Sequence, residues 1–478
     1  MQIVASRPLS LSRPAPFAGA TATSIRLSIG ALAASAVFAS ALAYNTKLGL
    51  AMLLGLCFVP LALLRLPLAI CGWVALLFFS RASALEAIPN KVLLFIGVCW
   101  IGLLAGRRAK LREQLAHNRV LIVWAAAFVV WVLLSLAWAP VPGAAERPVK
   151  ELLYASFGLL LLLGVGAILD RRHLRWLMLA FVAGAALSVL WGAAKGGLSM
   201  SGAGEVANLD NRFQGGAGDP NYLAAVLVPA IMLAGGLAVR RAPGQRVLLA
   251  LATAIIAIGL AATQSRGGLI SAGVCAVVAL LIWRGHRRLI LTLIGLAASA
   301  VVVFFIANPA AWHRVLGTNS NGSGRLDIWQ IAWRVVHDHP YVGVGIAQFP
   351  QVSPHYVLQP GALEYVNLIV EKHIVVHNLY LQLWAETGII GLLLFFGLIV
   401  TSMTAGWRAV RRFDAQGDVE MSALARAAIL ALIGMLTASF FLSNLEAGQL
   451  WVLLAFGPVL AGLARRQARA SPLLGAPG

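Results

Sequence analysis

Long apolar runs recur along this chain, and they limit its possible folds more than any other feature of the sequence. Most runs are about 17–25 residues long, which is the length that a helix needs to cross a bilayer. Hydrophobic residues make up 60% of the 478 residues and charged residues only 11%, so a soluble core cannot bury the apolar surface. The sequence therefore predicts an all-α integral membrane protein that crosses the bilayer many times.

The pattern gives fourteen candidate spans, and twelve is an equally acceptable count. Only Arg65 separates the runs at 47–64 and 66–80, and the run at 92–106 is short. The candidate spans are 24–44, 47–64, 66–80, 92–106, 120–139, 151–169, 174–194, 221–239, 247–264, 267–283, 289–307, 379–403, 423–443 and 449–464.

Basic clusters fall on alternate connections between these spans, which places the clusters on one side of the membrane. By the positive-inside rule that side is cytoplasmic, and both termini are then expected to be cytoplasmic. The net charge of +20 is mostly this topology signal, and no basic soluble domain is present that would bind nucleic acid. The clusters lie at 107–119, 171–175, 240–246, 284–288, 408–412 and 465–469.

Two long polar connections are expected on the opposite side. Residues 194–220 are rich in Gly, Ser and Asn, and residues 308–378 contain six of the nine histidines. We interpret 1–478 as a single membrane domain with 308–378 as one large loop outside the cytoplasm. A connection of about 70 residues is far longer than usual and suggests a function, although a passive cap is the alternative.

Part of this loop, residues 325–339, has the apolar periodicity of a helix. Pro340 is expected to end the helix, and Gly343 and Gly345 to form a turn. The predicted apolar stripe consists of Ile328, Trp329, Ala332, Val335 and Val336.

Three arginines lie on the outer side of the membrane, where the positive-inside rule predicts few basic residues. Arg212 precedes a span, Arg266 lies in a tight turn between two spans, and Arg325 opens the loop helix. A guanidinium wedged between membrane helices needs a partner, and the whole chain has only 17 Asp and Glu residues. A bidentate anionic ligand is therefore attractive, and backbone carbonyls or lipid phosphates are the alternative partners.

His377 lies where the long loop meets the next span. On a helix, positions 377, 384, 388 and 391 lie on one face, and the imidazole of His377 would stand at the start of that helix. Gly388 and Gly391 on the same face would allow a neighbouring helix to pack closely. The unperturbed pKa of an imidazole is near neutral, which suits a general base. An interfacial histidine with two packing glycines is the alternative.

Metal and nucleotide sites are poorly supported. His373 and His377 have a zinc-like spacing, but only Glu371 offers a third ligand. The sequence has no phosphate-binding Walker loop, and its outer loops have no Asp-x-Asp motif. We therefore expect no metal and no cofactor. The four cysteines lie in predicted spans and are interpreted as packing residues.

Four motifs, in this order along a multi-pass chain, resemble the signature of the O-antigen ligases and of the related polymerases and oligosaccharyltransferases of bacterial envelopes. The resemblance covers roughly residues 210–400. The motifs are Asp219-Pro220-Asn221, Thr263-Gln264-Ser265-Arg266-Gly267, Arg325-x-x-x-Trp329 with Pro340-x-x-Gly343-x-Gly345, and His377-Asn378-x9-Gly388-x-x-Gly391.

The resemblance implies an inverting glycosyltransferase with a GT-C-like fold in the bacterial inner membrane and an active site that faces the periplasm. A glycan on undecaprenyl pyrophosphate would be transferred to a hydroxyl group, which in the ligase belongs to a sugar of the lipid A core. The reaction is expected to need no nucleotide and no metal. We expect a monomer surrounded by membrane lipid.

The residue roles follow from that chemistry. His377 is the expected general base, and Arg266 and Arg325, with Arg212 third, are expected to bind the pyrophosphate. Tyr380 and Trp384 are candidates to stack on a sugar, with packing as the alternative. The supporting residues expected around them are Asn378, Gly388, Gly391, Asp219 and Trp329.

Two alternatives stay open within the family, since the polymerases and the protein O-oligosaccharyltransferases share these motifs. A secondary transporter of an anionic solute is the alternative from another class. Transporters place ionisable residues near the middle of the membrane and have repeated halves, whereas these charges cluster at one face. An interfacial enzyme is therefore favoured.

Overall fold

The structure, a computed structural model, describes residues 58–79, 88–104, 108–196, 212–316, 324–357 and 374–470. By their contacts, residues 65–478 form one compact unit, and residues 1–64 form another. The helices that bear on function all lie in the larger unit. The described residues of this unit are almost entirely helical and contain no β-strand, which confirms the predicted all-α class.

Nine helices among the described residues are long and apolar enough to cross a membrane, and three shorter apolar helices accompany them. Each coincides with one predicted span, whereas the predicted span at 24–44 and most of that at 47–64 lie outside the described residues. The long helices are α6 (Arg119–Leu134), α7 (Glu146–Val165), α8 (Arg171–Gly196), α9 (Pro220–Ala238), α10 (Pro243–Ala262), α12 (Arg287–Ala307), α17 (Leu379–Ala415), α18 (Val419–Ala438) and α19 (Gly448–Ala470), and the shorter are α3 (Leu66–Leu76), α4 (Ile88–Leu104) and α11 (Arg266–Ile282).

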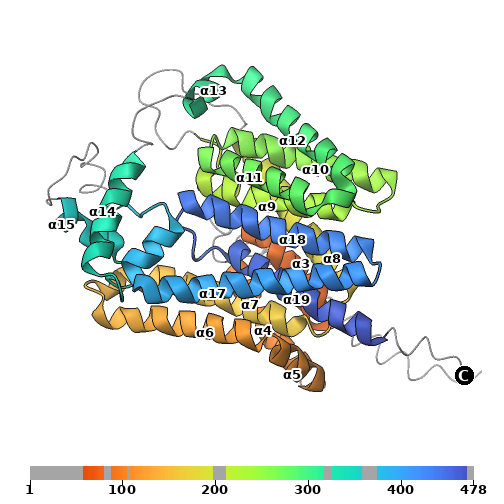
Figure 1. Ribbon diagram of the computed structural model, residues 1–478, viewed down its shortest axis with the longest axis horizontal. Coiled ribbons are helices and arrows are strands. Elements are labelled where there is room, and N and C mark those ends of the chain that lie inside the picture. Colours follow the sequence, from red (N-terminus) through yellow and green to blue (C-terminus); the bar gives the residue numbers. More distant parts are fainter. Residues whose placement is uncertain are drawn as a thin grey trace, which may run out of the picture. The chain divides into compact units, whose positions relative to one another are not determined.

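The helices differ in how much of their surface other helices cover. Helices α9 and α19 are largely buried: α9 packs against α18, α10 and α8, and α19 packs against α17 and α7 (Figure 1). Helix α12 instead leaves apolar side chains such as Val303 and Ile306 exposed. Such exposure is favourable in lipid and costly in water, so it supports the membrane assignment.

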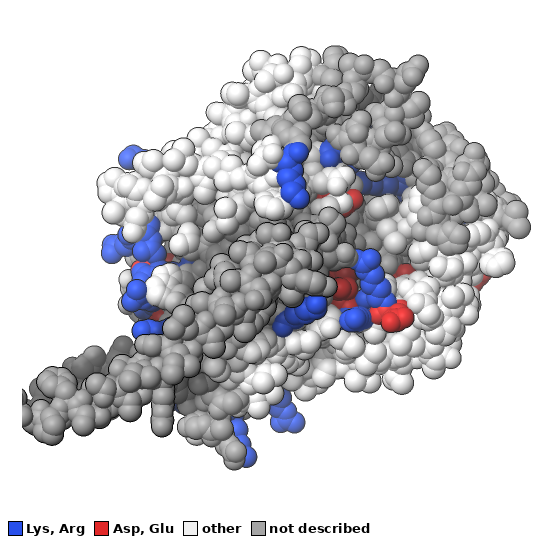
Figure 2. Space-filling model, turned by 180° about the vertical axis from the view of Figure 1, so that it is seen from behind, with Lys and Arg blue, Asp and Glu red and all other residues white. Residues whose placement is uncertain are grey.

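Ion pairs join several of the basic connections at one end of the unit. Arg171 contacts Asp418 at 2.9 Å, while Arg175 and Arg241 contact Glu420 at 3.0 and 2.7 Å. These pairs bring together the connections before α8, after α9 and before α18, as their alternation along the sequence predicts. On the face that Figure 2 shows, several Lys and Arg side chains lie close to Asp and Glu side chains.

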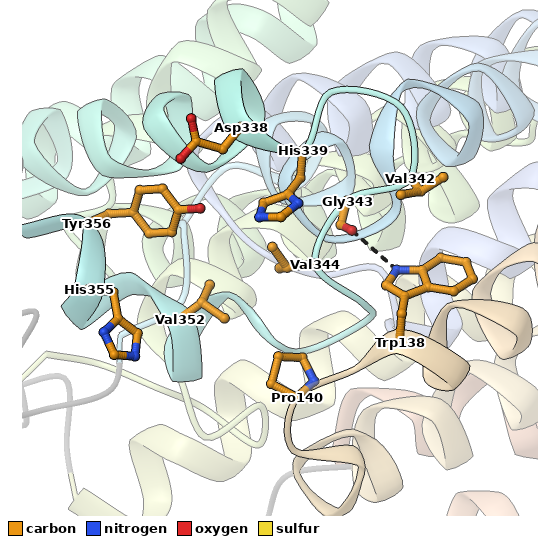
Figure 3. A pocket seen from close by; sticks show the side chains of 10 residues that line it. All are labelled: Trp138, Pro140, Asp338, His339, Val342, Gly343, Val344, Val352, His355 and Tyr356. Carbon is orange, nitrogen blue, oxygen red and sulfur yellow. Dashed lines mark hydrogen bonds between the residues drawn. The ribbon is translucent and has the colours of Figure 1, made fainter.

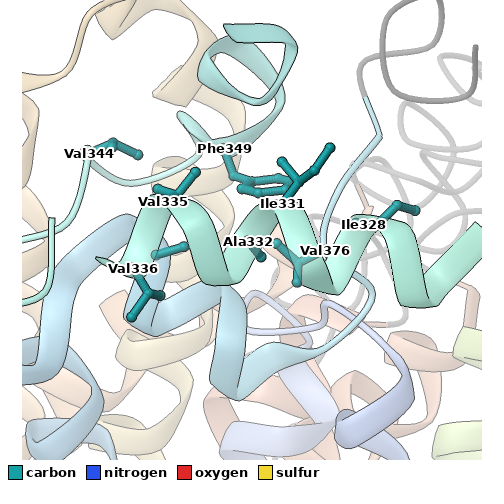
Figure 4. Packing of buried hydrophobic residues seen from close by; sticks show 9 residues of the cluster. Ile328, Ile331, Ala332, Val335, Val336, Val344, Phe349 and Val376 are labelled. Atoms are coloured by element: carbon teal, nitrogen blue, oxygen red, sulfur yellow. The ribbon is translucent and has the colours of Figure 1, made fainter. Parts of the chain in front are cut away.

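Three helices of the long loop are described: α13 (Pro309–Leu316), α14 (Arg325–Asp338) and α15 (Phe349–Val357). The predicted loop helix is confirmed as α14. Its apolar stripe packs on Phe349 of α15, on Val376 and on Ala385 of α17, as Figure 4 shows for Phe349 and Val376. This small core fixes the loop helices against the first turns of α17.

Side-chain caps begin α9, α11 and α17, and each of these three caps lies in one of the sequence motifs. Asp219 accepts a 2.7 Å hydrogen bond from the backbone N–H three residues further on, at the start of α9. Ser265 accepts one of 3.3 Å in the same way at α11, and Asn378 accepts two of 3.1 Å at α17. Short polar side chains are preferred at this position because they satisfy N–H groups that have no partner within the helix.

The predicted stripe through positions 377, 384, 388 and 391 is wrong. His377 precedes the cap of α17 and has a φ of 53°, and Gly388 breaks the helix with φ 69° and ψ −176°. The cause is the turn after α14, because a Cβ atom on Gly388 would collide with the carbonyl group of Tyr341. A loop turn, rather than a neighbouring helix, therefore approaches Gly388. Gly391 faces Trp131 of α6 and has the predicted packing role.

Candidate functional site

Four helix N-termini meet at the end of the unit where the long loop lies. Asp219 caps α9, Arg266 begins α11, Arg325 begins α14, and His377 directly precedes the cap of α17. The charges of Asp219 and Arg266 act on Arg325, and those of Arg325 and Asp219 act on His377. The structure thus brings residues from all four motifs within electrostatic reach of one another.

Arg212 joins two of these motifs through hydrogen bonds. Its Nε donates to the carbonyl oxygen of Thr263 at 2.8 Å, and its Nη2 donates to Oδ1 of Asn221 at 3.0 Å. Both of these partners are neutral oxygen atoms. Arg212 therefore holds the turn before Arg266 against the start of α9.

The turn that presents Arg266 is tightly packed and strained. Gln264 has a φ of 51°, a left-handed conformation that is uncommon for a residue other than glycine. Gly267 lies against Phe441 of the short helix η7 (Ser439–Phe441), so closely that a Cβ atom would be 2.7 Å from the Cβ of Phe441. Strained backbone of this kind is concentrated at functional sites, where the surrounding structure enforces it. The side chain of Arg266 is exposed at the first position of α11.

Arg325 is half-buried at the first position of α14. Burial lowers its pKa, the charge of Asp219 raises it, and the charge of Arg266 lowers it again. The guanidinium stays protonated because its reference pKa is far above neutral. The lowered pKa therefore means that burial and the charge of Arg266 make the cation less stable there, and a bound anion would relieve both effects.

His377 has an imidazole that is neutral near pH 7. Burial and the positive charge of Arg325 lower its pKa to about 4, against an opposing effect of Asp219. Its Nδ1 atom is buried and has no hydrogen-bond partner among the described residues. The sequence alone suggests a pKa near the unperturbed value, so the local environment changes the chemistry of this residue substantially.

The supporting residues have structural contacts of their own. Asn378 caps α17 and does not contact the imidazole through its Oδ1, which accepts from two backbone N–H groups. Trp329 donates from Nε1 to the carbonyl oxygen of Val376 at 3.1 Å, and its ring lies edge-on to Phe440 at 5.6 Å. Trp329 thereby fixes the backbone immediately before His377.

The side chains of Tyr380 and Trp384 pack against other aromatic rings, which is the alternative to stacking on a sugar. The ring of Tyr380 stacks on Phe396 at 5.7 Å, and its hydroxyl donates to the backbone of α18 at 2.8 Å. Trp384 lies edge-on to Trp333 at 5.2 Å and donates from Nε1 to the Pro340 carbonyl at 3.1 Å.

Glu386 is a buried residue that the sequence analysis did not single out. Its carboxylate accepts hydrogen bonds from the backbone N–H groups of Ala347 and Phe349, at 2.9 and 3.3 Å, and from Nε2 of Gln382 at 3.2 Å. It therefore holds the start of α15 against α17. The available signal was an acidic residue within an apolar span, which usually marks a specific partner.

A cavity of about 440 Å³ lies beside the helix start that Asp219 caps. Gly218 and Tyr222 line one part of it, and Arg147 and Glu151 line another part. The cavity offers both hydrogen-bond donors and acceptors next to the group of charged residues.

Metal binding by His373 and His377 stays untested, because His373 and Glu371 lie outside the described residues. Within the described part of the chain, no three His, Cys, Asp or Glu side chains are grouped so that they would hold a metal ion.

The fold and the site together define a multi-pass helical membrane protein with a cationic site at one end of its helices. Residues 251–396, less than half of the chain, match the family described as O-antigen ligase. The matched segment contains Arg266, Arg325 and His377, whereas Arg212 and Asp219 precede it. The match indicates glycosyl transfer of ligase or polymerase type. A comparison with curated proteins found no match.

Proposed function

We propose that this protein transfers an O-antigen glycan from undecaprenyl pyrophosphate to a sugar hydroxyl of the lipid A core, at the periplasmic face of the inner membrane. The observation that carries the proposal is the meeting of four helix N-termini around Arg266, Arg325 and His377. Each N-terminus carries about half a positive charge, which suits a pyrophosphate group.

Arg266 and Arg325 are the proposed pyrophosphate ligands, with Arg212 as a third. Binding of the pyrophosphate would offset the repulsion between Arg266 and Arg325, which supports a site built for an anion. The same cations would stabilise the charge that develops on the leaving pyrophosphate as the glycosidic bond breaks. Fixed donors aimed at developing charge are among the largest contributions to enzyme catalysis.

His377 is the proposed general base. A neutral imidazole accepts the proton of the acceptor hydroxyl while the hydroxyl oxygen forms a bond to the anomeric carbon. The bond from that carbon to the pyrophosphate oxygen breaks, and undecaprenyl pyrophosphate leaves with the electron pair. Attack opposite the leaving group inverts the configuration at the anomeric carbon. Asp219 favours the imidazolium ion that results, because its charge raises the pKa of His377.

The acceptor sugar is proposed to occupy the cavity bounded by Gly218, Tyr222, Arg147 and Glu151. A small number of polar groups in a concave site is typical of ligand pockets, and carboxylate and guanidinium groups suit sugar hydroxyls. The transfer is proposed to proceed without a metal ion.

The decisive experiment is transfer with the purified full-length protein, using a purified lipid-linked glycan and lipid A that carries a core. The proposal requires glycan-bearing lipid A as the product, in equal amount with and without a chelator. Glycan chains that lengthen without the core acceptor would support the polymerase instead, and transfer to a protein hydroxyl would support the oligosaccharyltransferase. Flux of an anionic solute into liposomes, without any transfer, would support the transporter.

A further inference from the structure

A cavity of about 550 Å³ lies at the opposite end of α14 from Arg325. Figure 3 shows that its lining comes from the end of α14, the turn after it, α15 and the segment after the short helix η2 (Ser135–Trp138). The Tyr356 ring and the His339 ring point into the same space, with Val352 beside them. The proposed mechanism uses none of these residues.

The lining combines apolar surface with polar groups at its edge. Trp138 and Tyr356 offer aromatic rings, Val344 and Val352 offer aliphatic surface, and His339, His355 and Asp338 offer hydrogen-bonding groups. A sugar ring has the complementary surfaces, because its C–H faces are apolar and its edges carry hydroxyl groups. The ten residues labelled in Figure 3 include no Lys or Arg, so the cavity does not suit a phosphate group. Its chemistry therefore differs from that of the arginine site.

Hydrogen bonds hold the walls of this cavity in place. Gln348 exchanges two with the backbone of Val141, at 2.9 and 3.0 Å, which ties α15 to the segment after η2. The indole N–H of Trp138 donates to the carbonyl of Gly343 at 3.2 Å. A tryptophan at the end of a membrane span is also common as an interfacial anchor, but an anchor does not need the Asp and His groups that surround this one.

Helix α14 sets the separation between the two sites. Arg325 is its first residue and Asp338 its last. At a rise of 1.5 Å per residue, these ends lie about 20 Å apart. A glycan chain whose pyrophosphate is bound at Arg325 would reach the cavity only if it contained several sugars.

We propose that the cavity bounded by Trp138, His339, Val352 and Tyr356 is a glycan-binding subsite, remote from the reacting bond, that holds sugars of a chain engaged at the arginine site. The inference rests on the proposed glycan transfer. The subsite makes affinity depend on the length of the glycan, because short glycans do not reach it.

The test is direct binding of two lipid-free probes to the full-length protein in detergent, measured by calorimetry. One probe is O-polysaccharide released from lipopolysaccharide by mild acid, and the other is core oligosaccharide released in the same way. Tyr356→Ala removes a wall of the cavity, and Val352→Trp fills it. Tyr341→Ala is the matched control, because Tyr341 is exposed in the neighbouring turn and does not line the cavity.

We expect both cavity variants to weaken binding of the O-polysaccharide by about tenfold or more, while they bind the core oligosaccharide normally and the Tyr341→Ala control binds both probes like the parent protein. Weaker binding of the core oligosaccharide as well contradicts the donor chain as the occupant, because the core belongs to the proposed acceptor. Unchanged affinity for both probes in both variants overturns the subsite, since two opposite changes of the cavity would then have no effect.

The outcome is separable from that of the proposed function, because binding is measured without turnover. If the protein binds glycan in a way that depends on Tyr356 but transfers none, only the proposed transfer reaction is contradicted. Transfer contradicts only the subsite if the Michaelis constants of the parent protein are equal for one-repeat and many-repeat donors, or if Val352→Trp and Tyr356→Ala leave their difference unchanged.

Discussion

The guanidinium of Arg325 lowers the pKa of the His377 imidazole, although the two residues come from opposite ends of the long loop. Burial acts in the same direction and is the larger cause. The free protein therefore holds a neutral imidazole that is ready to accept a proton. A bound pyrophosphate would offset the charge of Arg325 and so make the same imidazole more basic when the substrate is present.

This relationship predicts the pH dependence of transfer. The base must be neutral, so kcat/KM should stay constant from neutral pH downwards and fall only as the pH approaches the His377 pKa of about 4. Arg325→Gln removes a positive charge and should move this fall to higher pH, because protonation of His377 becomes easier. The measurement is kcat/KM for the lipid-linked donor against pH. Arg246→Gln, at the exposed start of α10, should leave the profile unchanged. A fall at the same pH in all three proteins contradicts the coupling.

Replacement of His377 by glycine separates catalysis from stability. The backbone at His377 is left-handed, with a φ of 53°, and glycine adopts this conformation without strain. His377→Gly should unfold at the same temperature as the parent protein or a higher one, while transfer falls by about 10²–10⁴-fold, the usual contribution of a general base. Thermal unfolding in detergent and the transfer rate are the two measurements. A variant that retains near-normal transfer excludes the base role.

Arg266→Lys tests whether a forked guanidinium is needed for the pyrophosphate. Lysine keeps the charge but loses the bidentate geometry, so transfer should fall by about 10–100-fold, the usual effect of losing a hydrogen bond to a charged group. Arg240→Lys, in the connection between α9 and α10, is the control and should transfer normally. An unchanged rate for Arg266→Lys would refute bidentate binding at this position.

Gly388→Ala should destabilise the protein. The new Cβ atom would collide with the carbonyl of Tyr341, and a φ of 69° is unfavourable for alanine. The cost should be about 1–3 kcal/mol or more, visible as a lower unfolding temperature in detergent. Gly273→Ala is the matched control, because its Cβ atom would meet nothing within 4 Å in α11 and alanine favours a helix. Equal unfolding temperatures for the two variants would contradict the assigned role of Gly388.

The membrane helices could be predicted from the sequence because each one depends on local properties. Apolar length gives the spans, and residues such as Asp219 and Ser265 give the helix starts. The apolar stripe on α14 could also be predicted, because its periodicity lies within fourteen consecutive residues. These features need no information about distant parts of the chain.

The break at Gly388 and the pKa of His377 were not predictable in this way. Gly388 adapts to the approach of Tyr341, which lies in a different part of the chain, and the imidazole is affected by Arg325 across the whole loop. The partners of Arg212 likewise come from two separate helix starts. Each of these features depends on tertiary contacts, which the sequence does not specify locally.

The break in α17 also has a mechanical consequence. Bilayers differ in thickness, and a long membrane helix adjusts to them by tilting. In a continuous helix that tilt would displace the end next to His377. Because the helical conformation stops at Gly388, the lower part of α17 can follow the lipid while the first two turns stay bound to the turn after α14. The position of His377 is thereby insulated from changes in the membrane around it.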